Sequence, residues 1–225
     1  MGATDNWYQE LSLEFADGQR EVMFLDMTRS GRHKPRQSGL PAEWTKLAFK
    51  KCPCCTLTQD MYCPAALSLE ETILTLNQRT SVELVTATAV DSENRRTSVK
   101  WPLQDVGAAF VQIAVFSSGC PVGSQFRPMV RDLRAFSTDR ELCKHLVFKH
   151  LLRHGGDAAA SEAEVVARLQ PVREIFYQLF LRLQEVPRGP FQDAIPNSIV
   201  HMHSMTLYLG IKVKELIAEV MQGMR

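Results

Sequence analysis

Residues 51–57 read Lys-Cys-Pro-Cys-Cys-Thr-Leu, and residues 62–66 read Tyr-Cys-Pro-Ala-Ala. These stretches hold four of the six cysteines of the chain. A fifth, Cys120, lies in Ser-Gly-Cys-Pro at residues 118–121. Proline fixes its own φ and pushes the preceding residue towards an extended conformation, so each Cys-Pro step holds a sulfur on a stiff turn. We therefore expect the fold to be organised around a site that these cysteines form.

The spacing of the cysteines is typical of a thiolate site. Cys52-x-x-Cys55 lets two sulfurs converge, Cys63 supplies a third, and Cys120 closes the set across the fold. Such a set suits a structural zinc ion or an iron–sulfur cluster, with a thiolate-ligated haem as a third option. Two alternatives stay open. The thiols pack as small hydrophobes, or Cys52 and Cys55 act as a redox dithiol that Cys54 or Cys63 resolves.

The composition is that of a globular protein and argues against several classes. Apolar residues make up 45% of the 225 residues, and the net charge of +1 creates no field that would attract nucleic acid or a membrane. No apolar run is long enough to span a bilayer, and residues 1–20 lack the apolar core of a secretory signal. We expect a cytoplasmic protein with reduced cysteines, which favours metal or redox chemistry over disulfides.

Two β-hairpins are predicted in the first half of the chain. Apolar and polar residues alternate in residues 8–15, Asp17-Gly18 signals a tight turn, and residues 21–27 return. Residues 81–90 are rich in β-branched side chains, and residues 95–101 form the second hairpin with them. Together the hairpins predict a four-stranded antiparallel sheet with one buried face.

Helical periodicity dominates the second half. Helices are expected at residues 68–78, 103–117, 126–134, 138–154, 161–183 and 193–221, and a short one at 43–47. Capping boxes that start at Ser68, Thr138 and Ser161 mark three of the helix starts, and Gly119 and Gly155-Gly156 mark two ends.

This order of elements predicts an α+β fold. An antiparallel sheet with a Cys-rich loop occupies residues 1–102, and a helical bundle occupies residues 103–225. Because the cysteines come from both parts, a shared site would make residues 1–225 a single domain.

Two other groups of polar residues are candidate sites. Asp193, Asn197 and His201 lie four apart and share one helix face, which points either into a site or, as base rates favour, into water. His150 and His154 have the spacing to bind a metal with a third ligand, but they also suit the C-terminal end of a helix, where cations are favoured.

Three further features have simple structural explanations as well. Arg127 follows Cys120 closely and either stabilises thiolates or lies on the surface. Cys143 is expected to lie on a helix with its side chain in the protein core. Residues 28–51 are locally basic and could contact an anion, but no aromatic residues alternate with the charges, so a solvated loop is favoured.

The cysteine blocks resemble those of an uncharacterised bacterial family. That family carries Cys-x-x-Cys-Pro-Leu, Cys-Pro-x-Ala and Ser-Gly-Cys-Pro blocks, the last followed by Arg-Pro-Met. The matching blocks here start at Cys52, Cys63 and Ser118, with Arg-Pro-Met at residues 127–129. This chain has Thr56 where the family has proline, and it has the extra thiol Cys54, so either Cys54 or Cys55 could be the second ligand. The resemblance implies no activity; it supports treating the blocks as one unit.

The sequence therefore predicts a protein with a zinc or iron–sulfur site at Cys52, Cys55, Cys63 and Cys120, in a structural, redox or signalling role. No nucleophile elbow, Walker A loop, GxGxxG or HExxH motif is present, which argues against an enzyme. The alternatives are a protein-interaction module with buried thiols and a CxxC redox sensor. We expect a protein partner or a second copy of the chain, and no membrane or nucleic acid. No small-molecule substrate is indicated.

Overall fold

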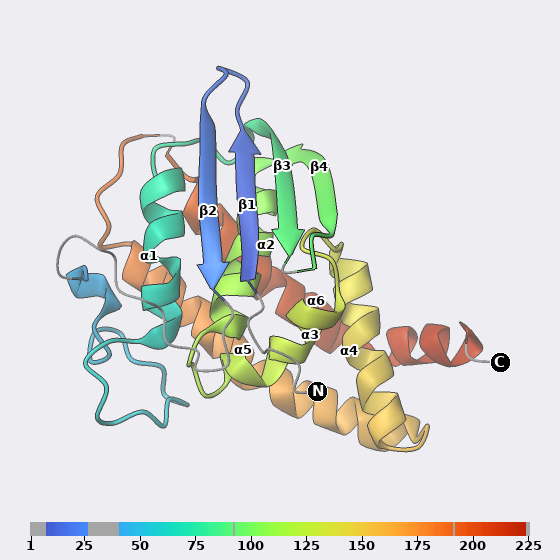
Figure 1. The fold of residues 1–225 in the computed structure, drawn as a ribbon. Coiled ribbons are helices and arrows are strands. Elements are labelled where there is room, and N and C mark those ends of the chain that lie inside the picture. The colour runs from blue at the N-terminus through green and yellow to red at the C-terminus, as the bar shows by residue number, and fades with distance from the viewer. Residues whose placement is uncertain (1–7, 27–40, 92, 191, 224–225) are drawn as a thin grey trace.

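The chain has an α+β architecture in which an antiparallel sheet precedes most of the helices (Figure 1). The computed structural model describes residues 8–26, 41–91, 93–190 and 192–223. The strands are β1 (Tyr8–Glu14), β2 (Arg20–Asp26), β3 (Leu84–Asp91) and β4 (Arg96–Pro102). The α-helices are α1 (Pro64–Leu76), α2 (Leu103–Ser117), α3 (Arg127–Asp132), α4 (Asp139–Arg153), α5 (Ala158–Leu183) and α6 (Ala194–Gly223). Two short 3-10 helices are η1 (Glu43–Thr45) and η2 (Gly123–Phe126). The predicted fold class is confirmed.

Both predicted hairpins are present, and they pair through β1 and β3 in the strand order β2-β1-β3-β4. Leu11 on β1 lies opposite Met23 on β2 and Ala89 on β3, and all three are buried. Gly18 has φ +80, which is why the turn of the first hairpin takes a glycine. The alternation of buried and exposed residues gives the sheet one face that packs against the helices.

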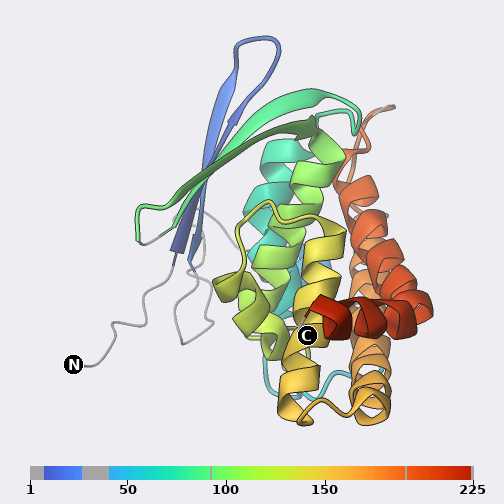
Figure 2. The same cartoon turned by 90° about the vertical axis from the view of Figure 1, so that its right-hand side faces the viewer.

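Helices cover one face of the sheet in successive layers (Figures 1 and 2). Both α1 and α2 contact the sheet, α6 packs on α2, and α5 and α4 pack on α6. As a result 13 of the 15 residues of α2 are buried. No described helix combines the length and the apolarity that crossing a bilayer requires.

Two of the three predicted capping boxes are wrong. Helix α1 begins at Pro64, and Ser68 lies inside it with its hydroxyl donating to the carbonyl of Ala65 at 2.9 Å. Proline is pre-organised for the first helical position and has no N–H to lose there, so the helix starts at the Cys-Pro step. Helix α5 begins at Ala158, and its cap is the carboxylate of Asp157.

The third capping box is confirmed. The backbone N–H of Glu141 donates to Thr138 Oγ1 at 3.3 Å, and the N–H of Thr138 donates to the Glu141 carboxylate at 2.8 Å. Gly155 and Gly156 end α4 with φ +59 and +89. Helix α2 ends at Ser117 as predicted, but the extended Ser118 follows it, and Gly119 has no left-handed conformation. Residues 28–40 of the predicted basic loop lie outside the described residues. In residues 41–51 the short helix expected at 43–47 is the 3-10 helix η1.

Helices α2 and α6 approach each other closely at Gly107. A methyl group added there would lie 2.1 Å from Oγ and 3.1 Å from Cβ of Ser198, which is fully buried. The Ser198 hydroxyl donates to the carbonyl of Ala194 at 2.7 Å, so moving it breaks a buried hydrogen bond. Glycine is therefore required by the helix spacing and not by its backbone conformation.

Gly107→Ala should lower the free energy of unfolding by about 1–3 kcal/mol, because the clash outweighs the better helix propensity of alanine. The double variant with Ser198→Ala removes the shorter contact and should regain most of the loss. Gly210→Ala on α6 is the matched control, since its nearest neighbour would be Arg173 at 3.6 Å. Urea unfolding midpoints measure all four proteins, and equal midpoints for Gly107→Ala and Gly210→Ala would contradict the close approach.

Candidate thiolate site

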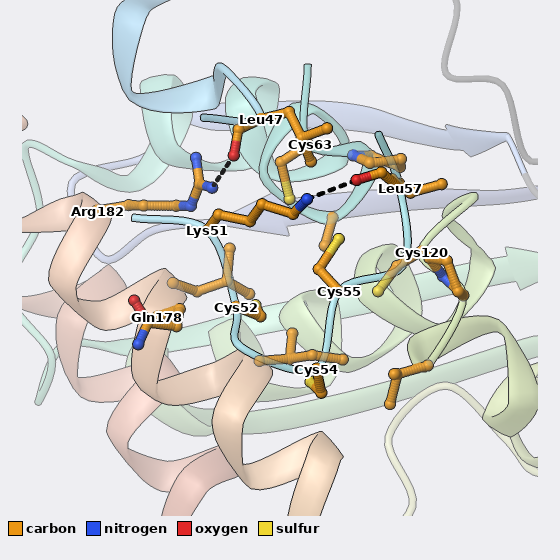
Figure 3. A pocket seen from close by; sticks show the side chains of 16 residues that line it. Leu47, Lys51, Cys52, Cys54, Cys55, Leu57, Cys63, Cys120, Gln178 and Arg182 are labelled. Atoms are coloured by element: carbon orange, nitrogen blue, oxygen red, sulfur yellow. Dashed lines mark hydrogen bonds between the residues drawn. The ribbon is translucent and has the colours of Figure 1, made fainter. Parts of the chain in front are cut away.

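Five of the six cysteines line one cavity (Figure 3): Cys52, Cys54, Cys55, Cys63 and Cys120. Its walls come from three parts of the chain, which are the segment before α1, the turn after α2 and one face of α5. The last wall is apolar, with Ile175 and Leu179, apart from Gln178 and Arg182. The cysteines that the sequence grouped by motif are thus brought together in space.

A tight turn places the CxxC pair. The N–H of Cys55 donates to the carbonyl of Cys52 at 3.0 Å, with Pro53 inside the turn. Lys51 Nζ donates to the carbonyl of Leu57 at 2.6 Å and closes the loop behind the turn. Cys54 lies on the side towards α5, with its sulfur 3.8 Å from the carbonyl oxygen of Pro171. The two ends of the CxxC motif therefore face the cavity on a short, braced loop.

Cys63 occupies the N-terminal end of α1. It is the N-cap residue, Pro64 follows as the first helical residue, and the Cys63 N–H donates to the carbonyl of Thr45 at 2.7 Å. The positive end of the helix dipole favours negative charge at this position. Figure 3 shows the side chains of Cys63 and Cys55 pointing towards one another. The backbone hydrogen bond and Pro64 therefore fix the position of Cys63 at the start of α1.

Cys120 is placed by the turn that follows α2. Its N–H donates to Ser118 Oγ at 3.2 Å, and its sulfur accepts from the N–H of Gly123 at 3.5 Å. The residue is 9% exposed. Cys120 therefore places its sulfur in the cavity directly after α2, a helix that is largely buried.

Burial favours the protonated form of the Cys52 and Cys120 thiols. It raises the pKa of Cys52 to about 12, with the neighbouring thiols Cys63, Cys54, Cys120 and Cys55 adding to the effect. Burial also raises the pKa of Cys120 to about 11. Negative charge in this cavity is unfavourable unless a positive group compensates it, which a bound metal ion does for a coordinating thiolate.

Arg182 supplies one such positive group. It is 1% exposed, and its guanidinium donates to the carbonyls of Trp44 at 2.6 Å, Lys46 at 2.8 Å and Leu47 at 3.5 Å. Burial lowers its pKa, while the nearby thiols act in the opposite direction. Arg182 was not among the site residues predicted from the sequence. The sequence feature that could have indicated it is its position: Arg182 follows Leu179 by three residues, so a charged side chain lies on the apolar face of α5.

The sulfurs surround the cavity without converging on a point. Among the described residues, no three of them lie within 4.8 Å of one another. The predicted separation of about 4 Å for a single tetrahedral zinc ion is therefore not met by these side-chain conformations.

The remaining thiol and the arginine of the SGCP-RPM block have structural roles. Cys143 is fully buried on α4, as predicted, with its sulfur 3.9 Å from Met205 Sδ. The guanidinium of Arg127 donates to the carbonyls of Ser117 at 3.0 Å and Ser118 at 3.3 Å. Arg127 thus braces the end of α2, where the turn to Cys120 begins.

The polar line on α6 joins structural elements. Asp193 accepts from the N–H of Ser81 at 2.8 Å and from Asn197 Nδ2 at 3.0 Å. The ring of His201 lies between Asp139, at 3.0 Å, and Asp105, at 3.2 Å. The hydrogen bond to Asp139 raises the pKa of His201, which outweighs the effect of burial. These residues tie the start of α6 to the turn before β3, and α6 itself to α2 and α4. None of them lines the cavity of the five cysteines, called the thiolate cavity below.

Comparisons with known proteins place the chain in a family without giving it an activity. Neither the curated proteins nor the solved structures contain a match. A family described as a domain of unknown function, DUF6901, matches residues 11–224. The match covers the sheet, the thiolate cavity and the helices together. The chain therefore belongs to the DUF6901 family.

Proposed function

We propose that the protein binds a metal centre through Cys52, Cys55, Cys63 and Cys120, with a structural, redox or signalling role. The observation that carries this proposal is the cavity itself, which collects these thiols from three separate parts of the chain. Three of the four residues precede proline, so their backbone is stiff before any ligand binds. A pre-organised group of soft sulfur donors is what zinc and iron–sulfur centres require.

The charges of the cavity support a metal over free thiols. Thiols that burial holds protonated are poor nucleophiles, but a metal ion displaces their protons when it binds. Four thiolates would carry more negative charge than the metal alone neutralises, and the buried guanidinium of Arg182 offsets part of the remainder. A metal centre thus gives this buried positive charge a partner of opposite sign.

The spread of the sulfurs favours an iron–sulfur cluster over a single zinc ion. Thiolates on one zinc ion lie roughly 3.8 Å apart, because each Zn–S bond is about 2.3 Å long in a tetrahedron. In a cluster the thiolates are shared among several iron atoms, so they can stand further apart. The arrangement around an open cavity fits the second geometry with less movement of the side chains.

A redox dithiol at Cys52 and Cys55 fits less well. A reactive thiol in a CxxC motif normally has a lowered pKa at the start of a helix. Here the motif forms a turn in a loop, and burial raises the pKa of Cys52 to about 12. The helix N-terminus at the cavity belongs to Cys63 instead.

The proposal is tested by purifying the full chain without oxygen and measuring its metal, sulfide and visible absorption. We expect near-stoichiometric iron and acid-labile sulfide, with broad absorption near 400 nm. Cys55→Ser should lose most of the iron. Cys54→Ser is the matched control in the same loop and should keep it, because its sulfur faces Pro171. Stoichiometric zinc without iron would select the zinc centre, and protein that retains neither metal would refute the proposal.

A further inference from the structure

A second group of metal-binding side chains lies where α4 and α5 meet. His150 and His154 are one turn apart near the end of α4, and Glu164 faces them from the second turn of α5. One donor atom from each residue lies within 4.8 Å of the other two. The glycine turn at residues 155–156 brings the two helix ends together. None of these residues lines the thiolate cavity.

The imidazole of His150 is the unusual member. It is 4% exposed, and its Nδ1 forms no hydrogen bond with any described residue. That nitrogen nevertheless lies 3.2 Å from Oε2 of Glu164, and Nε2 of His154 lies 2.5 Å from the same oxygen. One proton can bridge His154 and Glu164, but the buried nitrogen of His150 stays unsatisfied. Leaving such an atom unpaired is unfavourable, and a cation between the three donors would satisfy it.

The other oxygen of Glu164 is already held. Oε1 accepts from Arg153 at 2.6 Å and from Nε of Arg168 at 2.8 Å. These contacts fix the carboxylate and leave Oε2 directed at the histidines, as outer partners do for metal ligands. The two guanidinium groups also repel a cation. Arg153, however, is more than half exposed, so water screens part of that repulsion.

We propose that His150, His154 and Glu164 form a binding site for a divalent transition-metal ion such as Zn²⁺, independent of the thiolate cavity. Two imidazoles and a carboxylate are suitable ligands for this class of ion, and three protein ligands leave a fourth position open. Donors on one tetrahedral zinc ion lie roughly 3.4 Å apart, so His154 and Glu164 need to separate by roughly 1 Å. His154 and Glu164 are partly exposed, which gives the ion a route from solvent.

The test is a titration of the purified full chain with Co²⁺, followed by visible absorption and equilibrium dialysis. We expect the wild-type protein to bind about one equivalent more than Glu164→Gln, and His154→Gln to bind at least tenfold more weakly than wild type. His145→Gln is the matched control on α4, since its ring lies by Asp132 and not in the site. All four chains keep every cysteine, so metal at the thiolate cavity contributes equally to each.

A second readout separates binding from folding. Zn²⁺ should raise the melting temperature of the wild type and of His145→Gln more than that of Glu164→Gln or His154→Gln, because zinc at the cysteines adds the same shift to all four proteins. If one variant fails to fold, the other carries the comparison. Equal Co²⁺ stoichiometry and equal thermal shifts in wild type and Glu164→Gln would overturn the proposal and leave the cluster as a set of ion pairs.

Discussion

Cys120→Ser should release the metal and lower the melting temperature more than any other single cysteine change. Cys120 follows the buried helix α2, whereas Cys52, Cys55 and Cys63 precede α1. In the proposed metal centre the Cys120 sulfur would therefore join two distant parts of the chain. A protein that loses a ligand present at 100 times its Kd loses about 2.7 kcal/mol. For a chain of this size that corresponds to a fall of roughly 5–11 °C.

The control for this prediction is Cys54→Ser. It changes a thiol in the same cavity, but its sulfur lies by Pro171 at the α5 wall. It should shift the melting temperature by no more than about 2 °C, the effect of a surface change of about 0.5 kcal/mol. Calorimetry and metal analysis on the same samples show whether the fall in melting temperature accompanies the loss of metal. A Cys120→Ser protein that keeps its metal and melts with the wild type would show that packing alone joins the two parts.

Arg182→Met should destabilise the protein by at least about 3 kcal/mol, because a hydrogen bond from a charged donor contributes about 1.5–3 kcal/mol. The guanidinium donates to three carbonyls around η1, at Trp44, Lys46 and Leu47. Methionine removes this donor from all three, and only the Lys46 carbonyl keeps another one that the structure describes, the N–H of Phe49. The segment from η1 to the CxxC turn should loosen as a result. Urea unfolding of chelator-treated protein measures the loss without any contribution from a metal.

Two further variants show whether geometry or charge is responsible. Arg182→Lys keeps the charge but has no planar fork, so it should recover only part of the lost stability. Arg188→Met is the control, in the loop that follows the same helix. Arg188 donates to a single carbonyl, that of Leu183, and lies at the surface. If Arg182→Met and Arg188→Met destabilise equally, the buried guanidinium has no special role.

Local sequence patterns predicted the secondary structure correctly where a single local interaction fixes a turn or a helix end. Asp17-Gly18 makes a turn with φ +80 at the glycine, and the Thr138 capping box satisfies its own helix end. The apolar run at residues 103–117 became a helix with these bounds. The cysteine spacing also identified four residues that now line one cavity. Each of these features depends on residues close in the chain, whose geometry is set by φ preferences and short hydrogen bonds.

The wrong helix starts have a common cause. The pattern of a serine followed three residues later by a glutamate also fits residues inside a helix, where the hydroxyl bonds to a carbonyl of the preceding turn. Ser68 and Ser161 both do this, donating to Ala65 and to Asp157. The true starts are decided by Pro64, through its fixed φ, and by the carboxylate of Asp157, so a nearby competing signal was stronger.

Only the tertiary structure decided what surrounds the thiols. It brought Arg182 from α5 to carbonyls more than 130 positions earlier in the chain, and it turned Glu164 towards the two histidines of α4. It also set the close approach at Gly107, which no local pattern requires. The sequence by itself determined which residues can form strands, helices and a thiolate site. Distances between separate elements depend on how whole helix faces pack against each other, and that information is spread over the entire core.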